Sequence, residues 1–366
     1  MNFSCNQQQL SKILNTVSKA VSIRTTTPIL KGIYISVNKD NVTFCGSDGN
    51  IIIEEKLDAY IKEEGSVVVS ANLFKETVRR FSSGNINIYK EDNKIVIKNE
   101  KSEHKIGWLP ADEFPLIEEM KEKEILNFDK EILKDMIAKT KFAASTDELK
   151  GIMRGVLFEI KKDSFNMIAI DGYKMAIVKE PMNNLKELSF VIEANILNEI
   201  LNILKDNSLD KEINVDFDGK RAIFQIGSTK VSTRILEGKF IDYERILPRN
   251  NESKIIINRR ELVDATERAS ILAREGNNNL IKLCIDENLL TITTRTDMGY
   301  VKEEVDIEKK GENLEIGFDS KLILDPLKVI DDENIVIEFR GPLDGAFITS
   351  CENGNYSYLV LPVRLK

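Results

Sequence analysis

The spacing of apolar residues predicts helices of one kind at three places along the chain. Apolar side chains recur at intervals of three and four, a pattern typical of a helix that packs on one face. Between these helices, apolar and polar residues alternate with a period of two, which predicts strands. The core positions of the three helices are Leu10, Ile13, Leu14, Val17 and Val21, then Ile132, Leu133, Met136 and Ile137, then Leu262, Val263, Thr266 and Ala269.

A second kind of helix follows each of the first. It is predicted to begin at residues 70–74, 193–197 and 319–323, so the pattern returns after 123 residues, from Ala71 to Ala194, and after 126, from Ala194 to Ser320. Repeats of this length are domains, because solenoid units span only about 20–50 residues. The sequence therefore predicts three like domains, at residues 1–121, 122–249 and 250–366. Three like domains joined end to end indicate an arc or part of a ring.

Hairpins are predicted at matching places in the three domains. The paired runs are residues 85–89 with 94–98, 212–217 with 221–226, and 335–339 with 345–350. Polar residues ahead of the helices predict N-terminal caps at Asn6 or Gln7, Asp129 and Asp319. Charged or polar linkers are predicted at residues 118–124 and 248–253. The fold class is α+β, with two helices and about eight strands in each domain.

Composition narrows the class of protein. The 366 residues are 42% hydrophobic and carry a net charge of −8. No apolar run reaches the ~20 residues needed to cross a bilayer, and the N-terminus has no export signal, so the sequence predicts a cytoplasmic protein without a membrane partner. Four cysteines without paired spacing (Cys5, Cys45, Cys284 and Cys351) are predicted to be buried, reduced thiols.

Catalytic chemistry is not indicated. The single histidine, His104, lies between charged residues and is predicted to be at the surface. Nucleotide-binding and zinc motifs are missing. Asp48, Asp171 and Asp297 stand at one place in the repeat, ahead of a glycine, and are predicted to build turns. The sequence thus predicts no catalytic residue, no metal and no cofactor; a metal-dependent nucleic-acid enzyme, the alternative, requires clustered carboxylates outside the repeat.

Charge gives a weak indication of a polyanion partner. The six predicted helices are together slightly basic, whereas the rest of the chain is acidic. Basic residues on them include Arg79 and Arg80. Solvated helix faces of mixed charge are common, so a structural ring that never holds nucleic acid is a third hypothesis beside the DNA-binding and enzymatic ones.

Seven segments resemble one family, in the same order and at the same spacing along the whole chain. The chain resembles the bacterial DNA polymerase III beta subunit, the β sliding clamp. The segments are Arg24 with Pro28-Ile29-Leu30, Leu109-Pro110-Ala111-Asp112-Glu113-Phe114-Pro115, Gly155-Val156-Leu157-Phe158-Glu159, Asp171-Gly172-Tyr173-Lys174-Met175-Ala176, Asp242-Tyr243 with Arg245-Ile246-Leu247-Pro248, Glu315-Ile316-Gly317-Phe318, and Leu361-Pro362-Val363-Arg364-Leu365.

The resemblance implies a head-to-tail homodimer that closes as a ring around duplex DNA, with helices inside and sheets outside. It implies a non-catalytic processivity factor, working in the cytoplasm at the nucleoid. Its implied partners are duplex DNA held without sequence preference, the replicative polymerase alpha subunit, clamp-loader subunits, and other proteins with clamp-binding motifs, such as repair polymerases, ligase and mismatch-repair proteins.

The resemblance also implies three sets of site residues. A pocket between domains 2 and 3 takes short linear motifs of partners; here Ile241 replaces a frequent proline and Tyr173-Lys174 a frequent His-Arg. The expected peptide-binding residues are Met153, Ile170, Gly172, Tyr173, Lys174, Ile241, Arg245, Ile246, Leu343, Leu359, Leu361, Pro362, Val363 and Arg364. The expected DNA-binding residues are Arg24, Arg79, Arg80 and Lys150, and the expected dimer-interface residues are Ile106, Trp108, Ile271, Leu272, Glu303 and Glu304.

Overall fold

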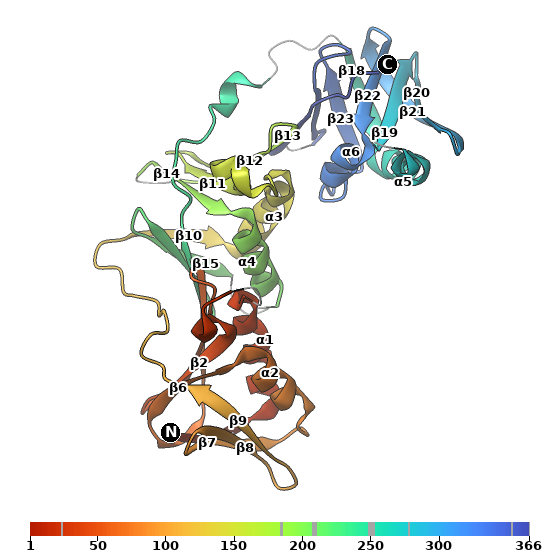
Figure 1. Ribbon diagram of the computed structural model, residues 1–366. Coiled ribbons are helices and arrows are strands. Elements are labelled where there is room, and N and C mark those ends of the chain that lie inside the picture. The colour runs from red at the N-terminus through yellow and green to blue at the C-terminus, as the bar shows by residue number, and fades with distance from the viewer. Residues whose placement is uncertain are drawn as a thin grey trace. The chain divides into compact units, whose positions relative to one another are not determined.

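The chain forms two compact units in the computed structural model (Figure 1). The structure describes residues 1–22, 25–183, 186–206, 211–247, 253–276, 279–352 and 354–365. The first unit comprises Met1–Leu133 with Asn198–Ile235, and the second Lys134–Leu197 with Leu236–Lys366. The central third of the chain therefore contributes to both, through helices α3 (Lys130–Thr140) and α4 (Ala194–Asp206).

The first unit is built on one antiparallel sheet of 13 described strands, in the order β10-β15-β16-β17-β4-β3-β2-β6-β9-β8-β7-β1-β5. Helices α1 (Gln7–Val17) and α2 (Ala71–Arg80) pack on each other, and α1 lies on β3 and β4. The strands are β1 Asn2–Asn6, β2 Gly32–Val37, β3 Val42–Ser47, β4 Ile51–Leu57, β5 Tyr60–Glu63, β6 Gly65–Ser70, β7 Asn85–Glu91, β8 Lys94–Lys98, β9 Glu103–Leu109, β10 Glu124–Asp129, β15 Glu212–Phe217, β16 Arg221–Ile226 and β17 Thr229–Arg234.

The second unit has a sheet of 12 described strands, in the order β14-β11-β12-β13-β25-β24-β23-β18-β21-β20-β19-β22. Helices α5 (Arg259–Glu275) and α6 (Ser320–Leu327) pack together, and α5 lies on β19, β20 and β21. The strands are β11 Gly155–Ile160, β12 Ser164–Ile170, β13 Lys174–Pro181, β14 Leu188–Glu193, β18 Ser253–Asn258, β19 Leu280–Asp286, β20 Leu289–Thr296, β21 Gly299–Gly311, β22 Leu314–Asp319, β23 Asn334–Phe339, β24 Ala346–Ser350 and β25 Tyr356–Val360.

The helices follow from their apolar faces and caps. In α1, Leu10, Ile13, Leu14 and Val17 are all buried, and the Asn6 side chain accepts hydrogen bonds from two backbone N–H groups of the first turn. Asp129 and Asp319 cap α3 and α6 in the same way, which confirms the predicted caps. The three predicted hairpins are also present, as β7–β8, β15–β16 and β23–β24, and the α+β class is confirmed.

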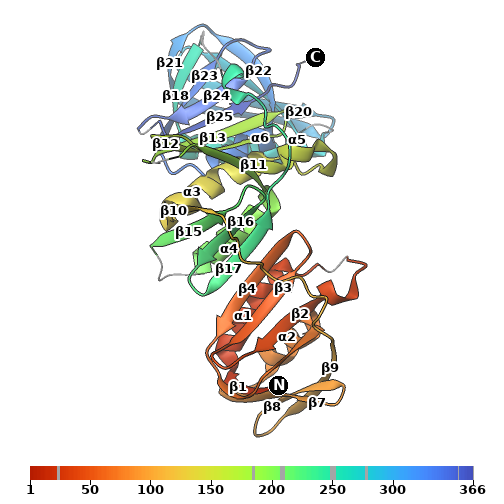
Figure 2. The same cartoon turned by 90° about the vertical axis from the view of Figure 1, so that its left-hand side faces the viewer.

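Strand pairing joins successive thirds of the chain (Figure 2). In the first unit, β4 pairs antiparallel with β17 of the central third. In the second unit, β13 of the central third pairs antiparallel with β25 of the last third. Each junction is thus a continuous sheet, and the strands that meet there hold the side chains of the sites described below.

Asp-Gly turns precede β4 and β13. The Asp48 carboxylate accepts hydrogen bonds from Asn50 and Ile51 N–H, and the Asp171 carboxylate from Tyr173 and Lys174 N–H. Gly49 and Gly172 supply positive φ angles of 95° and 94°. The predicted turn chemistry is confirmed at these two places.

Several local predictions are wrong. In the third turn the Thr296 hydroxyl, rather than Asp297, accepts the backbone N–H of Met298. Cys5 and Cys45 are buried, but Cys284 is half-buried and Cys351 is exposed, because β19 and the loop after β24 turn these side chains away from the core. Ile132 is exposed on α3. The first linker ends one residue early because Glu124 begins β10; residues 248–252 of the second lie outside the described residues.

Candidate functional site

The C-terminal segment docks on the second unit instead of fraying. Leu361 N–H donates to the Tyr173 carbonyl with an N–O distance of 2.8 Å, and Val363 N–H donates to the Gly317 carbonyl at 2.8 Å. A Cβ atom at Gly317 would lie 2.8 Å from the Val363 oxygen and 2.7 Å from a Leu365 methyl group. Glycine at position 317 therefore permits the close approach, and the apolar terminus becomes part of a surface.

An apolar cluster lies beneath this segment. Its buried members include Ile170, Met175, Tyr243 and Leu359, and half-buried Ile241 packs against it. Two exposed apolar side chains are near it in the chain: Tyr173, whose carbonyl accepts the Leu361 N–H, is 62% exposed, and Leu343, two residues before Gly345, is 65% exposed. Ile246 and Leu361 are also exposed. Large exposed apolar groups above a continuous apolar core are the usual composition of a surface that anchors a ligand or peptide.

Two lysines near the cluster are fixed by polar contacts on different faces of the sheet. Lys174 Nζ lies 3.2 Å from Asp325 Oδ2 of α6 and 5.7 Å from the centre of the Phe142 ring. Lys150 Nζ donates to the Asp171 carbonyl at 2.6 Å and lies 5.1 Å from the centre of the Tyr173 ring. The Lys150 ammonium group is therefore held beside Tyr173, where it gives the apolar surface a basic edge. The Lys174 side chain leaves β13 on the face opposite to Met175 of the cluster and is held beside α6.

A hydrogen-bonded carboxylate fixes the 3₁₀ turn η5 (Tyr243–Arg245) on β11. Glu159 Oε2 accepts from the Tyr243 hydroxyl at 2.7 Å and from Asn166 Nδ2 at 2.8 Å, and lies 3.2 Å from Lys161 Nζ. Burial on its own would raise the pKa of Glu159, but these donors outweigh it and hold the pKa below its usual value. Burial, and then the Glu159 carboxylate, raise the pKa of Tyr243. The turn that carries Arg245 and Ile246 is thus anchored by a charged group.

Tyr243→Phe removes one donor to Glu159 and is expected to lower the free energy of unfolding by about 1 kcal/mol at neutral pH. Because the folded-state pKa of Glu159 is depressed, its contribution is present above its unfolded pKa of about 4.3 and is lost as the pH falls through the folded value. The difference between wild type and variant should therefore shrink below about pH 4. Thermal unfolding at several pH values measures it, with Tyr60→Phe, at an exposed hydroxyl, as the control. A difference independent of pH would mean that Tyr243 acts through packing alone.

The structure brings most of the expected peptide-binding residues into one region. Ile170, Ile241 and Leu359 share the apolar cluster, while Gly172, Tyr173, Lys174 and Leu361 meet at the backbone contact above it. Met153 is half-buried in η4 (Glu148–Arg154), next to Ile152 of the cluster. Pro362 and Val363 are half-buried and Arg364 is exposed. Arg245 is exposed and pairs with Asp242 through a 2.7 Å contact.

Other residues of this region were not predicted. Phe347 and Leu247 pack on the apolar cluster, and Asp325 is the ion-pair partner of Lys174. The alternation of residues 345–350 could have indicated Phe347 as a core position; no sequence pattern pairs Lys174 with Asp325, 151 residues away. Lys150 remains a predicted DNA contact, and its ammonium group also lies beside Tyr173.

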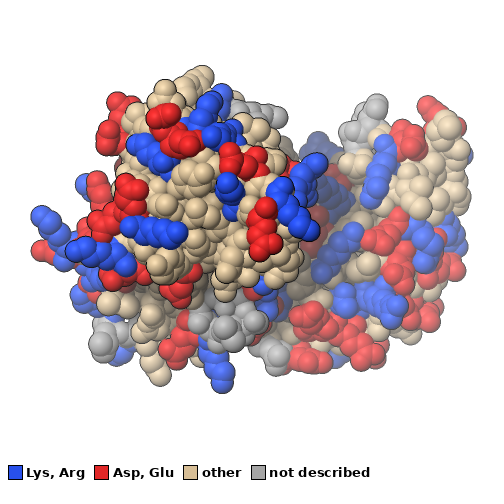
Figure 3. Space-filling view, turned by 90° about the horizontal axis from the view of Figure 1, so that it is seen from below, with Lys and Arg blue, Asp and Glu red and all other residues tan. Residues whose placement is uncertain are grey.

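Two of the three basic side chains of α2, Arg79 and Arg80, lie at its C-terminal end. Arg79 and Arg80 share one partner, Glu76, with N–O distances of 2.5 and 3.8 Å, and both remain largely exposed. Such exposed pairs contribute little and are readily exchanged for other anions. Arg24 lies outside the described residues. Figure 3 shows that acidic and basic side chains are intermixed on the face seen from below.

Among the described strands, β9 and β21 lie inside their sheets but have a free edge along part of their length, in addition to the free edges of the terminal strands β5, β10, β14 and β22. Residues 103–107 of β9 pair with β8 on one side only, since β6 reaches β9 only at Trp108 and Leu109. Residues 299–306 of β21 pair with β20 on one side, because β18 begins to pair with β21 at Ile307. Free edges are ready templates for a strand of another chain.

The expected interface residues lie beside these edges. Ile106 and Trp108 project from β9 on one face, with the Trp108 indole donating to the Asp92 carbonyl at 3.0 Å. Leu73 of α2, which was not predicted, is 57% exposed, and α2 contacts β9. On the second unit, Ile271 of α5 is 70% exposed.

Leu272 and the two glutamates complete the expected surface of the second unit. Leu272 is close to Gly299 at the beginning of β21, where a Cβ atom would lie 3.8 Å from a Leu272 methyl group. Glu303 pairs with Arg268 at 2.6 Å and Glu304 with Lys302 at 2.5 Å. The Arg268 guanidinium holds the pKa of Glu303 below its usual value. In a single chain both carboxylates are thus already neutralised.

Metal and membrane chemistry have no visible basis in the described residues. No three His, Cys, Asp or Glu side chains among them gather closely enough to hold a metal ion. None of the described helices has the length and apolar character that a membrane crossing requires. His104 is exposed and packs its ring edge on Phe81, with centroids 5.1 Å apart, as predicted for a surface residue.

Comparison with known proteins identifies the family of the chain. Family profiles for the N-terminal, central and C-terminal domains of the DNA polymerase III beta subunit match residues 1–118, 127–242 and 244–364. The chain belongs to the DNA polymerase III beta subunit family. The beta sliding clamp of Staphylococcus epidermidis is 32% identical, covering 100% of this chain and 99% of that protein.

Solved structures of this family agree with the fold. The DNA polymerase sliding clamp of Bacillus subtilis has a TM-score of 0.96 at 30% identity, and covers 100% of both chains. A putative DNA polymerase III beta subunit from Eubacterium rectale has a TM-score of 0.95 at 29% identity, again over 100% of both chains. The fold is therefore that of three sliding-clamp domains, each with two helices and antiparallel strands.

Proposed function

We propose that the chain is a DNA sliding clamp, which closes as a head-to-tail homodimer around duplex DNA and tethers the replicative polymerase for processive synthesis. The single observation that carries this proposal is the match of the three beta-subunit domains along the chain. The domain limits 1–121, 122–249 and 250–366 are part of the proposal. A replication clamp acts on the chromosome, so we place it in the cytoplasm, at the nucleoid.

Ring size supports a dimer. Six α-helices are found in the described residues, so a dimer would offer twelve. Twelve helices spaced about 8–10 Å apart give a circle about 35 Å across at the helix axes. Subtracting a helix diameter of about 10 Å leaves a hole of about 25 Å, wide enough for B-form DNA. Six helices would leave less than about 10 Å.

The free edges of β9 and β21 support a heterologous contact between chains. One edge is beside Ile106 and Trp108, and the other beside Ile271 and Leu272. Because the two surfaces differ, the β9 surface of each chain would contact the β21 surface of the other. Such a heterologous contact forms a closed ring when the rotation that relates the two chains returns to its starting point. The apolar side chains would then be covered and the strand edges paired.

The peptide site is proposed over the apolar cluster of the second unit. A partner segment with two apolar side chains would bury them beside Tyr173, Leu343 and Leu361, with Arg364 at the rim. Candidate partners are the replicative polymerase alpha subunit, clamp-loader subunits, repair polymerases, ligase and mismatch-repair proteins. Because the terminal segment is already held by two backbone hydrogen bonds, little of its freedom remains to be lost on binding.

DNA contacts are proposed to be weak and independent of sequence. A closed ring stays on DNA by topology, so few phosphate contacts suffice and sliding is not hindered. The proposed contacts are Arg24, Arg79, Arg80 and Lys150. No catalytic step is assigned to any residue. The alternative, a metal-dependent nucleic-acid enzyme, lacks a carboxylate cluster within the described residues.

Replacing Arg79 and Arg80 together by alanine is expected to shorten retention on DNA while leaving partner-peptide affinity unchanged. Each lost phosphate contact should lower the dependence of log K on log salt by about 1. Retention at several salt concentrations measures the effect. Lys309→Ala with Lys310→Ala, which removes the same charge from β21, is the matched control. Equal losses from the two double variants would indicate a general charge effect and would remove the helix face from the DNA site.

A further inference from the structure

A hollow of about 370 Å³ lies in the first unit, where the first third of the chain meets the central third. Its floor is apolar and includes Ile52, Phe114 and Leu116. Phe114 is buried and stacks on Tyr34 with ring centroids 5.4 Å apart, whereas Leu116 is 44% exposed. Arg221 and Arg234 line the other side. The volume falls within the range of about 300–1,000 Å³ that is typical of ligand sites.

The hollow occupies the same place in the repeat as the apolar surface beside Tyr173. In both, an Asp-Gly turn leads into a strand that pairs with the last strand of the next third, β4 with β17 and β13 with β25. Arg234 N–H donates to the Asn50 carbonyl at 3.3 Å, as Leu361 N–H donates to the Tyr173 carbonyl at 2.8 Å. The backbone of the first junction therefore repeats that of the second.

The side chains at the two junctions differ in chemistry. Pairing of Ile51 with Thr233 and of Lys174 with Val360 aligns the two junctions. In this alignment Ser232 and Arg234 stand where the second junction has Leu359 and Leu361. Across the next strand, Arg221 stands where the second junction has Gly345, because Ala222 pairs with Thr233 as Ala346 pairs with Val360. One arginine thus replaces the apolar rim residue Leu361, and a second replaces a glycine beside it.

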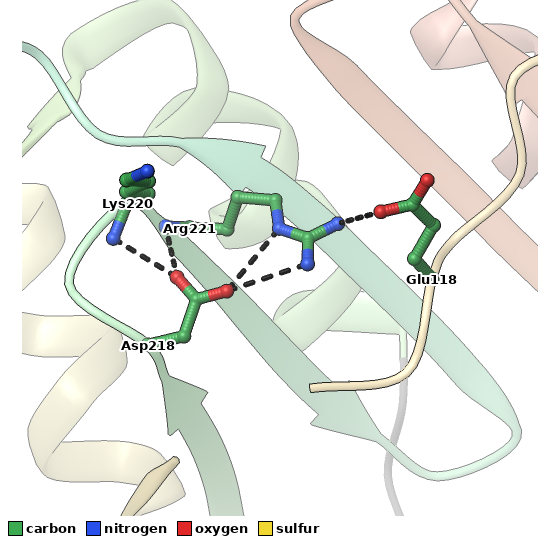
Figure 4. A network of polar contacts seen from close by, with 4 residues as sticks. All are labelled: Glu118, Asp218, Lys220 and Arg221. Carbon is green, nitrogen blue, oxygen red and sulfur yellow. Dashed lines mark hydrogen bonds and ion pairs between the residues drawn. The ribbon is translucent and has the colours of Figure 1, made fainter. Parts of the chain in front are cut away.

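The two arginines are neighbours, but among the described residues ion pairs neutralise only one of their charges. Arg221 and Arg234 stand directly opposite each other on β16 and β17, so both side chains leave the same face, where like charges are unfavourable. Figure 4 shows the partners of Arg221, which is bound by Asp218 at 3.3 Å and by Glu118 at 3.4 Å. Arg234 is exposed, and its guanidinium has no ion-pair partner in the part of the chain that the structure describes. A positive charge therefore remains above an apolar floor.

Of the two carboxylates that pair with Arg221 among the described residues, Asp218 is fixed by further hydrogen bonds and Glu118 is not. The Asp218 carboxylate accepts the backbone N–H groups of Lys220 and Arg221 at 2.9 and 2.7 Å, which fixes it within its turn. Glu118 belongs to the charged linker, is 81% exposed at its side chain, and reaches Arg221 through a single contact. Exposed contacts of this kind contribute little. A carboxylate from another molecule could therefore take the place of Glu118.

We propose that this hollow binds a short peptide segment of a partner protein in which an apolar side chain stands next to a carboxylate. The apolar side chain would lie on Ile52, Phe114 and Leu116, and the carboxylate would bridge Arg221 and Arg234 after displacing Glu118. Arginine suits this role because its planar donors match a carboxylate. The site is separate from the one beside Tyr173, and the inference does not depend on the clamp function.

Two fluorescent pentapeptides test the proposal. The acidic peptide is Gly-Asp-Leu-Phe-Asp. The amide peptide is Gly-Asn-Leu-Phe-Asn with an amidated C-terminus, so it carries no carboxylate. Fluorescence anisotropy on the full chain should give at least about tenfold tighter binding of the acidic peptide. Replacing its phenylalanine by photoreactive benzoylphenylalanine should direct cross-links to residues 114–118. Because this comparison changes the peptide alone, it needs no variant of the protein. Equal binding of the two peptides, or cross-links confined to residues 359–365, would overturn the proposal.

Two variants and one control distinguish a role of Arg234 and Glu118 in binding from a structural role. Arg234→Gln should reduce binding of the acidic peptide about tenfold, whereas Lys230→Gln on the same strand should not. Glu118→Gln should strengthen binding of the acidic peptide about threefold and leave the amide peptide unaffected, because it removes the internal competitor. If the Arg221–Glu118 pair merely joined the two thirds of the chain, Glu118→Gln would bring no gain, and that result would also contradict the proposal.

Discussion

Replacing Ile271 and Leu272 together by alanine is expected to turn the proposed dimer into monomers. Ile271 is 70% exposed in a single chain, a large apolar surface for one side chain to leave in water. Truncating two interface anchors costs about 3 kcal/mol, which weakens the dimer about 150-fold. Sedimentation velocity across a range of concentrations should show the mass of one chain where wild type shows that of two.

The control is Leu149→Ala, because Leu149 is 94% exposed and lies in η4, away from α5 in the sequence. It should keep the mass of wild type. Thermal unfolding of both variants excludes simple misfolding as the cause. An unchanged dimer mass for the double variant would place the interface elsewhere on the chain, and would also remove the argument from the free edge of β21.

Removing residues 361–366 is expected to abolish binding of partner peptides and to leave the dimer intact. The deletion takes away the rim residue Leu361 and the two backbone hydrogen bonds to Tyr173 and Gly317. A peptide that buries a few hundred Å² of apolar surface at roughly 25 cal/mol per Å², less its ordering cost, binds in the micromolar range. The deletion should weaken that affinity at least about a hundredfold, as measured by anisotropy with a peptide carrying two apolar side chains.

Tyr173→Ala provides a milder version of the same test, with Tyr60→Ala as the matched control, since both tyrosines are largely exposed. The first should weaken peptide binding about tenfold and the second not at all. Unchanged affinity after the deletion would show that the peptide binds elsewhere. Loss of the dimer after the deletion would show that the terminal residues serve the core of the fold instead of a site.

Local features of the fold followed from the sequence. The Asn6 cap, the hairpin of β7 and β8, and the turns at Asp48 and Asp171 depend on contacts between residues close together in the chain, so short patterns predict them. The docking of the C-terminal segment is consistent with its sequence, because an apolar run at a terminus requires a surface to cover it. The prediction that Asp297 accepts the backbone hydrogen bond in the third turn was wrong, since Thr296, one residue earlier, offers the same kind of acceptor.

Contacts between distant segments could not be predicted in the same way. Nothing in the local pattern of β17 selects β4 as its neighbour, since any strand with free backbone groups would satisfy it. The ion pair between Lys174 and Asp325 and the contact of Lys150 with Asp171 are of this kind. The placement of Arg221 and Arg234 at the positions of Gly345 and Leu361 became visible only when strand register aligned the two junctions.

Retention on circular DNA tests the central claim most directly. The protein is loaded on nicked circular duplex by a clamp loader, and the bound fraction is followed by gel filtration before and after a single cut linearises the DNA. A ring held by topology should stay on the circle at moderate salt, where phosphate contacts alone are weak, and should be lost within minutes of linearisation. Equal retention on circular and linear DNA would mean that direct contacts hold the protein, and would contradict the account of this chain as a sliding clamp.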